Sequence, residues 1–248
     1  MVIFKFYEKC DNMALQINPQ MSFEQQQKLK EELLSDELID LAKEKYLPLE
    51  TLMAYYRCVI MEIETKFFVL NEELSLEYDR NPIETIKSRL KSWDSLVKKM
   101  RNKNLTMNLK TLEENIFDVA GVRVICSFQE DIYRLADSFL RQDDVRLIEK
   151  KDYIKNPKTN GYRSLHLIVE VPIFLQNETR YMKAEVQFRT IAMDFWASLE
   201  HKLRYKKNIS DADAEMLGEE LLICSQMSAE LDERMQTVKN KISVAEKS

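Results

Sequence analysis

The sequence RYMKAEVQFRT, residues 180–190, alternates apolar and polar side chains from Met182 onward. The apolar set is Met182, Ala184, Val186 and Phe188, and the polar set is Lys183, Glu185, Gln187 and Arg189. Successive side chains of a strand point to opposite sides of a sheet, so this alternation predicts a strand with one face against a core. Glu185 then lies in mid-strand on the polar face.

The segments before this strand extend the predicted sheet. SLHLIVEV (164–171) alternates in the same way and places His166 on the polar face. VRLIEKKDY (145–153) is a further strand candidate, and the β-branched run VAGVRVICSF (119–128) indicates a buried strand. Residues 129–142 return to a helical pattern. The middle of the chain is therefore predicted as β-α-β-β-β, with four or five strands in the sheet.

Helices are predicted on both sides of this region, because apolar residues recur there three and four positions apart. Pro48 is suited to the first turn of a helix, and Asn81-Pro82 ends one pattern and opens another. The predicted helices are residues 22–46, a segment from Pro48 to about Leu74, residues 82–101, residues 191–206 and residues 212–245.

The last predicted helix carries an apolar stripe with heptad spacing. Its members are Leu217, Leu221, Cys224, Ser228, Leu231, Met235, Val238 and Ile242, with Ser228 as the one polar interruption. The helices at both ends of the chain exceed what a small sheet needs for cover, so we expect a homo-oligomer. Packing of these helices within one subunit is the alternative.

Composition limits the class of protein. Of the 248 residues, 45% are apolar and 32% are charged, which is typical of a globular chain. A net charge of −5 gives no overall field that would attract DNA. No apolar run reaches the roughly 18 residues that a membrane span needs, and no signal peptide is expected.

The four cysteines form no C-x-x-C pair, so neither a zinc site nor a disulfide framework is predicted. Cys58, Cys126 and Cys224 fall in apolar patterns and are expected to pack in the interior. A reducing, cytoplasmic location fits this pattern.

Cations are concentrated in two segments of this acidic chain. Residues 87–110 hold eight Lys or Arg and one acid, and a second basic cluster spans residues 150–163. Arg89, Lys91, Ser95 and Lys99 would project from one short helical stretch, where forked and point cations suit a polyphosphate. A solvated helix face is the alternative, because most charge runs are of that kind.

Two carboxylates stand at strand positions, Asp118 before residues 119–128 and Glu185 in mid-strand. Acids in such places can hold Mg²⁺ while phosphates complete its shell, and one can accept a proton from a hydroxyl. A turn or cap at Asp118 and simple exposure of Glu185 are the alternatives. Arg123 interrupts the apolar run and needs a carboxylate, a phosphate or an aromatic face as its partner.

The loop before residue 164 combines an aromatic ring with polar groups: Lys158, Asn160, Tyr162 and, at the start of the strand, His166. The ring could stack on a base, the amide of Asn160 could meet a base edge, and the basic residues could meet phosphates. An Asn-Gly turn with Tyr162 as a surface anchor is the alternative. Two phosphate-suited clusters, two acids and one ring together suggest two nucleotides and a metal.

These residues lie in segments that resemble the synthetase domain of the RelA/SpoT-type alarmone synthetases, in that family's order. The segments are RLKSWDSLVKK (89–99), DVAGVR (118–123), KTNGYRSLH (158–166), EVQFRT (185–190) and FWASLEH (195–201). The resemblance covers roughly residues 82–206, with flanking helices as in the small, single-domain members.

The resemblance implies a pyrophosphokinase that moves the β,γ-pyrophosphate of ATP to the 3′-hydroxyl of GDP or GTP, with Mg²⁺ as cofactor. It also implies that Arg89 and Arg123 enclose the adenine. Lys91, Ser95 and Lys99 would then hold the ATP phosphates.

The resemblance further implies that Asp118 binds Mg²⁺, and that Glu185 assists with the metal and acts as general base. On the acceptor side it implies that Tyr162 stacks on guanine with Asn160 near its edge, and that Lys158 and His166 contact phosphates. The chain has only two histidines, too few for the metal site of the hydrolase domain in larger members, so no alarmone hydrolysis is expected.

The fold class expected from these observations is α+β, with a nucleotidyltransferase-like, mostly antiparallel mixed sheet, covering helices and long terminal helices. The expected organisation is an extension (1–21), N-terminal helices (22–81), a catalytic core (82–206) and a C-terminal oligomerisation helix (207–248). The resemblance favours a tetramer. A nucleotidyltransferase with another acceptor, or a non-catalytic nucleotide- or RNA-binding regulator, are the alternatives.

Overall fold

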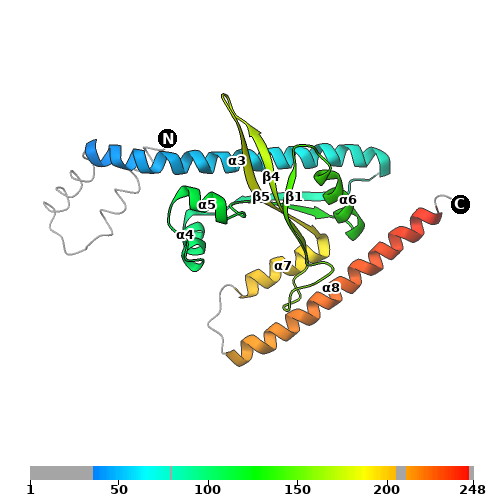
Figure 1. The fold of residues 1–248 in the computed structure, drawn as a ribbon. Helices are drawn as coiled ribbons and strands as arrows, with labels where there is room; N and C mark the ends of the chain where they lie inside the picture. Colours follow the sequence, from blue (N-terminus) through cyan, green and yellow to red (C-terminus); the bar gives the residue numbers. More distant parts are fainter. Residues whose placement is uncertain (1–35, 79, 205–210, 246–248) are drawn as a thin grey trace, which may run out of the picture. The chain divides into compact units, whose positions relative to one another are not determined.

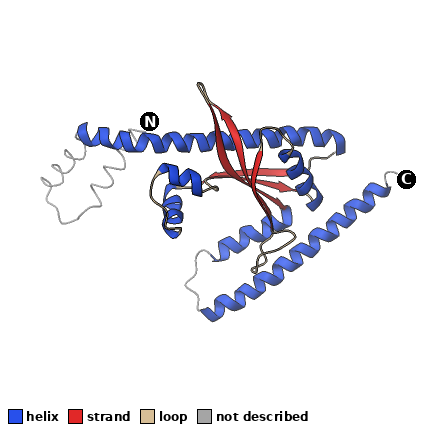
Figure 2. Ribbon diagram, viewed as in Figure 1, coloured by secondary structure: helices blue, strands red, loops and turns tan. Residues whose placement is uncertain are grey.

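The computed structural model describes residues 36–78, 80–204 and 211–245 (Figures 1 and 2). The chain divides into two compact units, residues 1–54 and residues 55–248. The whole sheet and every candidate site residue belong to the second unit. The expected N-terminal extension, and the helix predicted over residues 22–46 as far as residue 35, lie outside the described residues.

A five-stranded sheet forms the centre of the second unit. Its strands are β1 (Ile83–Leu90), β2 (Ala120–Cys126), β3 (Arg146–Asp152), β4 (Leu165–Phe174) and β5 (Thr179–Thr190). They lie in the order β1-β2-β5-β4-β3, and every neighbouring pair is antiparallel except β2 and β5. This arrangement confirms the predicted mixed, mostly antiparallel sheet.

Helices cover the apolar face of the sheet and flank its ends. In the described part of the chain they are α3 (Asp36–Tyr78), α4 (Trp93–Asn102), α5 (Leu109–Asn115), α6 (Gln129–Leu140), α7 (Ile191–Arg204) and α8 (Asp211–Ala245). The ring of Phe67 on α3 stacks on Phe139 of α6 at 4.7 Å and meets Phe188 of β5 edge-on at 5.5 Å. These aromatic contacts join two helices to the buried face that the alternation in β5 predicts.

Residues 82–101 do not form the single helix that the sequence predicts. Ile83–Leu90 is the edge strand β1, paired along its length with β2, and α4 begins only at Trp93. Ile83, Ile86 and Leu90 have the spacing of a helical apolar face, but backbone pairing with β2 overrides that local preference. Ser92 marks the true start of the helix, because its hydroxyl accepts a hydrogen bond from the Ser95 amide at 3.4 Å.

Two further expectations are wrong in detail. Pro48 does not begin a new helix, since α3 runs through it, and a helix can continue past a proline at the loss of one backbone hydrogen bond. Cys126 is buried and Cys58 is half-buried, but Cys224 is exposed on α8 and does not pack in the interior.

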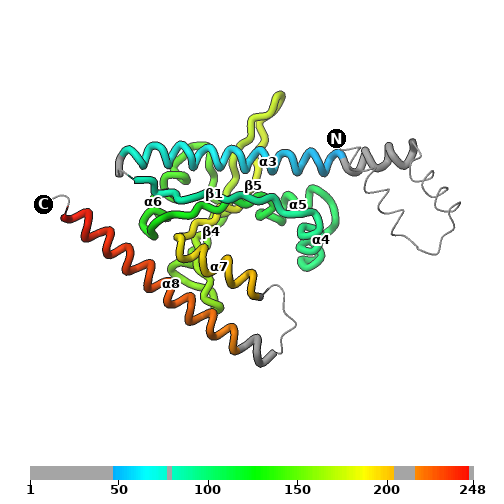
Figure 3. Tube along the Cα trace, turned by 180° about the vertical axis from the view of Figure 1, so that it is seen from behind, coloured from blue at the N-terminus to red at the C-terminus, as the bar shows by residue number. Residues whose placement is uncertain are grey.

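Helix α8 lies beside α7 in both views of the chain (Figures 1 and 3). One side of α8 is docked, and this side carries the buried polar residues Ser225 and Asp232. Most of the predicted apolar stripe lies on another side, where Leu231 and Ile242 remain 56% and 54% exposed, whereas its polar member Ser228 is bonded to Ala192 of α7. No helix in the described part of the chain is long and apolar enough to cross a membrane.

Candidate active site

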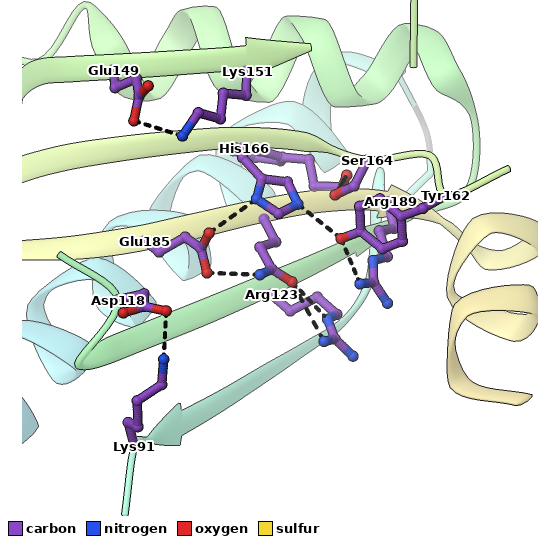
Figure 4. Close-up of polar contacts among 12 residues, drawn as sticks. Lys91, Asp118, Arg123, Glu149, Lys151, Tyr162, Ser164, His166, Glu185 and Arg189 are labelled. Carbon is purple, nitrogen blue, oxygen red and sulfur yellow. Dashed lines mark hydrogen bonds and ion pairs between the residues drawn. The ribbon is translucent and has the colours of Figure 1, made fainter. Parts of the chain in front are cut away.

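The polar face of β4 and β5 carries the first group of candidate residues. Glu185 accepts hydrogen bonds from His166 Nδ1 at 3.0 Å and from Gln187 Nε2 at 2.7 Å (Figure 4). His166 stands opposite Gln187 in the antiparallel register of the two strands. The alternation in the sequence therefore brings a carboxylate, an imidazole and an amide together on one face.

Opposing effects set the pKa of Glu185. Burial favours the neutral acid, and the hydrogen bonds from His166 and Gln187 favour the carboxylate, with the net result that the pKa lies below its usual value. The negative charge of Asp118 acts in the same direction as burial, so the two acids are close enough to interact. Glu185 is therefore ionised at neutral pH.

A chain of hydrogen bonds continues from His166 into the loop before β4. His166 Nε2 lies 2.8 Å from the Tyr162 hydroxyl, which accepts a hydrogen bond from the Arg189 guanidinium at 2.8 Å. With the imidazole proton on Nδ1, the Tyr162 hydroxyl donates to His166, and His166 donates to Glu185. Each polar group in the chain thus has a partner.

Asp194, in the first turn of α7, joins cations from three strands. Its carboxylate lies 2.9 Å from Lys87 of β1, 3.2 Å from Arg123 of β2 and 3.0 Å from Arg189 of β5. Burial opposes its ionisation, but the three cations outweigh burial and hold the pKa of Asp194 below its usual value. Arg123 therefore has the carboxylate partner that its place in an apolar strand requires.

Asp118 binds two of the lysines that the resemblance assigns to the ATP phosphates. Its Oδ2 accepts hydrogen bonds from the ammonium groups of Lys91 and of Lys99, the latter at 2.7 Å. Lys91 follows β1 and Lys99 belongs to α4, so the two lysines converge from different elements and not from one helix. Burial opposes ionisation of Asp118, and the lysines outweigh it, so its pKa is lowered.

Two arginines lie on one face of β1 and β2. Arg89 stands opposite Gly121, and a Cβ at Gly121 would lie 3.6 Å from Arg89 Cγ, so the arginine side chain crosses the glycine. Arg123 lies two residues further along β2 and therefore on the same face. Burial, and the charges of Arg189 and Arg89, lower the pKa of Arg123. The two guanidinium groups therefore interact electrostatically on one face of the sheet.

The N-terminus of α4 presents two hydroxyls. Ser95 Oγ is exposed and lies 2.8 Å from Oγ of the capping residue Ser92. Both are close in sequence to Lys91, which contacts Asp118. Ser95, which the resemblance assigns to the ATP phosphates, therefore lies close to Lys91 in sequence. It is at the end of a helix and not on a helix face.

The loop that carries Tyr162 is a tight turn. Gly161 has a φ of 88°, its amide donates to the Lys158 carbonyl at 2.8 Å, and the Asn160 side chain accepts from the Tyr162 amide at 3.2 Å. The Lys158 ammonium lies 5.0 Å from the centre of the Tyr162 ring and 4.7 Å from that of Tyr153. A base that stacks on that face of Tyr162 must displace Lys158.

Several residues of this region carry no strong signal in the sequence. The alternation in β5 places Gln187 and Arg189 on a polar face without indicating their partners, and no motif marks Asp194. An acid in the first turn of a helix is common, so Asp194 gave no signal of its three partners. Lys151 of β3 stands opposite His166, and its ammonium lies 2.9 Å from Glu149. The basic cluster from residue 150 onward was the signal for Lys151.

The two candidate metal ligands, Asp118 and Glu185, suit one hard cation that also binds phosphate. Asp118 and Glu185 point into the same space (Figure 4). Asp118 Oδ1 is buried and has no hydrogen-bond partner in the described part of the chain. No group of three or more metal-binding side chains occurs among the described residues. Mg²⁺ fits such a set, since it often takes one or two carboxylates and completes its shell with phosphate and water.

Comparison with known proteins identifies the family. Residues 88–210 match the model described as the region found in RelA/SpoT proteins. GTP pyrophosphokinase YwaC of Bacillus subtilis is 46% identical over 187 residues, which cover 75% of this chain and 88% of the relative. The chain belongs to the RelA/SpoT family. GTP pyrophosphokinase YjbM of the same species is 31% identical over 79% of this chain and 91% of its own length.

Solved structures place this RelA/SpoT family member among small synthetases. Small alarmone synthetase 2 of Bacillus subtilis is 42% identical, with a TM-score of 0.69 over 78% of this chain and 98% of that one. Small alarmone synthetase 1 of that species, bound to its product pppGpp, is 31% identical with a TM-score of 0.70, over 79% of this chain and 98% of that one. Every candidate site residue lies inside the matched region, residues 88–210.

Proposed function

We propose that this RelA/SpoT family member is a GTP pyrophosphokinase. It transfers the β,γ-pyrophosphate of ATP to the 3′-hydroxyl of GDP or GTP, releases AMP and does not hydrolyse the product. The observation that carries the proposal is that the cations around Asp118 face the hydrogen-bonded chain that ends at Glu185 (Figure 4).

On the donor side, the sheet offers a purine site beside a phosphate site. Arg89 and Arg123 provide guanidinium planes, which stack well on aromatic rings. Lys91 and Lys99 each use one N–H on a shared carboxylate and keep two further donors for phosphate oxygens. Ser95 adds a hydroxyl at the N-terminus of α4, an end that favours anions. ATP is therefore the proposed donor.

On the acceptor side, Tyr162 is the stacking platform for guanine and Asn160 lies next to it in the turn. When the base stacks, Lys158 is released from the ring and its ammonium can meet the acceptor phosphates. His166 faces the same site, and Lys151 adds an exposed cation from β3. The two lysine ammonium groups suit the 5′-phosphates of GDP or GTP.

The transfer step needs a base and an aligned phosphate. Glu185 takes the proton of the 3′-hydroxyl, whose oxygen then bonds to the β-phosphorus. The bond between that phosphorus and the α–β bridging oxygen breaks, and AMP leaves with the electron pair. His166 keeps the Glu185 carboxylate oriented, and the surrounding cations offset the charge of two polyphosphates.

Asp118 and Glu185 are the residues that would hold Mg²⁺. The ion, when bound, neutralises phosphate charge and aligns the transferred group. Asp118 Oδ1, which lacks a protein partner among the described residues, is the atom best suited to bind it.

The test is incubation with γ-labelled ATP, Mg²⁺ and GDP or GTP. The expected result is label on guanosine tetra- or pentaphosphate together with free AMP, and no loss of added product. AMP incorporated into a product would indicate a nucleotidyltransferase instead. Nucleotide binding without turnover would indicate a regulatory protein.

We also propose a cytoplasmic homo-oligomer, with a tetramer favoured. The exposed apolar stripe on α8 supports self-association, because Leu231, Met235, Val238 and Ile242 remain about half exposed. Light scattering should give a mass of four times the 29.4 kDa of one chain for a tetramer, and at least twice the mass of one chain for any oligomer. A monomer at micromolar concentration would overturn this proposal.

A further inference from the structure

The underside of the Tyr162 turn rests on α8. Ser225 of α8 is only 6% exposed, and its hydroxyl donates a hydrogen bond to the Gly161 carbonyl at 2.6 Å. Gly161 is itself buried. A helix near the end of the chain thus makes a direct polar contact with the loop proposed to receive guanine.

The two backbones approach each other closely at this point. A Cβ at Gly161 would lie 2.7 Å from Ser225 Cβ and 3.2 Å from Leu222 Cδ1. Real Cβ atoms are not found so near a helical Cβ, and the φ of 88° also favours glycine. The contact therefore leaves little room for the turn to shift toward α8.

Ser225 acts from a fixed position, because α8 is tied to its surroundings on both sides of this residue. The Trp196 indole of α7 donates to the Leu221 carbonyl at 2.8 Å, and Ser228 donates to the Ala192 carbonyl at 3.1 Å. Further along α8, Asp232 accepts a hydrogen bond from the Thr190 hydroxyl at the end of β5. These anchors lie before and after Ser225 along the helix.

Gly161 lies between the two residues proposed to contact guanine. The Gly161 carbonyl is part of the peptide group that joins Gly161 to Tyr162. The peptide group before it joins Asn160 to Gly161. Asn160 also donates a hydrogen bond to Glu200 of α7, and this bond is longer, at 3.3 Å. Fixing the Gly161 carbonyl therefore fixes the direction in which the Tyr162 ring leaves the backbone.

We propose that Ser225 is a positioning residue for the guanine nucleotide, acting through the Gly161 carbonyl on the orientation of Tyr162 and Asn160. This inference rests on the proposed acceptor role of the turn. It assigns to α8 a part in acceptor binding in addition to its exposed apolar stripe.

Ser225→Ala tests the inference, and Ser228→Ala is the matched control. Both substitutions remove one serine hydroxyl from the docked side of α8, but only Ser225 contacts the turn. For Ser225→Ala we expect KM for GDP to rise about fivefold, the effect of one hydrogen bond. KM for ATP should stay unchanged. Ser228→Ala removes one of the three anchors of α8 but no contact to the turn, and the bonds of Trp196 and Thr190 still hold the helix, so both KM values should stay near wild type.

Equilibrium titration with GDP, and separately with a non-hydrolysable ATP analogue, gives the same comparison without turnover. A Kd for GDP that rises only in Ser225→Ala supports the inference. An unchanged Kd for GDP would overturn it, and so would equal losses for both nucleotides or in both variants, since these indicate a structural role. A wild-type protein that binds GDP but makes no tetraphosphate would refute the proposed reaction and leave this comparison valid.

Discussion

The donor and acceptor regions of the site are built in different ways. The donor region consists of Arg89, Lys91, Ser95, Lys99 and Asp118, and the acceptor region consists of Tyr162, His166, Glu185, Gln187 and Arg189. Arg123, the second arginine proposed for adenine, is bonded to Asp194 and to Gln187 and so links the two regions. In the acceptor region each side chain bonds to the next, from Arg189 to Glu185. In the donor region the two lysines meet only at Asp118, while Arg89 and Ser95 are exposed.

This difference separates a preorganised region from one that its ligand must organise. A network of bonded side chains holds its geometry before substrate arrives, so one substitution disturbs several neighbours. Exposed cations gain their order from the phosphate they bind, so each one can be removed with a more local effect. Acceptor-side substitutions should therefore cost more than donor-side substitutions, and should spread further.

The largest expected effect is that of Glu185→Gln. The amide keeps the shape and can still accept a hydrogen bond from His166, but it cannot take a proton from the 3′-hydroxyl. We expect kcat for pyrophosphate transfer to fall by roughly 10³-fold, within the range of general-base catalysis. Labelled-ATP assays measure the loss, and thermal unfolding checks that the fold is retained.

Glu170→Gln is the control for this substitution. Glu170 lies on the same face of the neighbouring strand β4, where its partner is Arg146 and not a member of the acceptor region. Its activity should match that of the wild type. If Glu185→Gln keeps more than about a tenth of the activity, Glu185 is not the general base.

The sequence predicted the acceptor region better than the donor region, for a physical reason. Strict alternation in β4 and β5 fixed which side chains share a face, so His166 and Glu185 could be placed together. In the donor region, Ile83, Ile86 and Leu90 imitate a helical pattern, and β1 is an edge strand with few buried residues. Only the pairing with β2 makes residues 83–90 a strand and not a helix, and that pairing cannot be read from the local sequence.

Contacts between distant segments were beyond prediction for the same reason. The ion pairs of Asp194 join Lys87, Arg123 and Arg189, which are brought together only by the order of the strands. The convergence of Asp118 on Glu185 follows from the parallel pairing of β2 with β5. Residue types and spacing indicated the chemistry of the site. Which side chains contact one another could be known only from the fold.

Tyr162→Ala should produce the next largest effect. Loss of a stacking ring is worth about 1–3 kcal/mol, so we expect KM for GDP to rise by roughly 30-fold, and more than KM for ATP. Tyr162→Phe separates the ring from the hydroxyl. It keeps the platform but removes the bonds to His166 and Arg189, so kcat should fall while KM for GDP changes little.

Steady-state kinetics with each nucleotide varied in turn checks both Tyr162 variants. Equal increases of the two KM values in Tyr162→Ala would indicate that the ring is structural. A wild-type kcat in Tyr162→Phe would show that the bonded chain does not prepare Glu185, and the contrast between the two regions would then fail.

Lys99→Ala tests the donor region, where a smaller and more local effect is expected. Removal of one charge-assisted contact should raise KM for ATP roughly tenfold and leave KM for GDP unchanged. Lys98→Ala is the control, because Lys98 is an exposed neighbour on the same helix. An equal rise for both nucleotides in Lys99→Ala would mean that the donor lysines are part of one network with the acceptor region.

The smallest expected effect concerns stability, and it compares Asp118 with Asp232 of α8. Two lysines lower the pKa of Asp118, whereas burial raises the pKa of Asp232 above its usual 3.8, despite the bond from Thr190 and the charge of Arg163. The native state therefore binds more protons at Asp232 than the unfolded chain does. This term lowers the free energy of unfolding as pH rises through the window between the usual and the raised pKa.

Asp232→Asn removes that cost and keeps an oxygen to accept the Thr190 hydroxyl. We expect the free energy of unfolding at pH 7 to rise by no more than about 1 kcal/mol, and the gain to vanish as pH falls below the usual pKa. Asp118→Asn should behave in the opposite way: it loses stability relative to wild type at pH 7, and the loss shrinks as acid protonates the wild-type carboxylate. Urea titrations between about pH 2.5 and 7 measure both differences. A destabilised Asp232→Asn at neutral pH would mean that Arg163 fully compensates the buried charge, and that the support of the acceptor region depends on an ion pair as the donor region does.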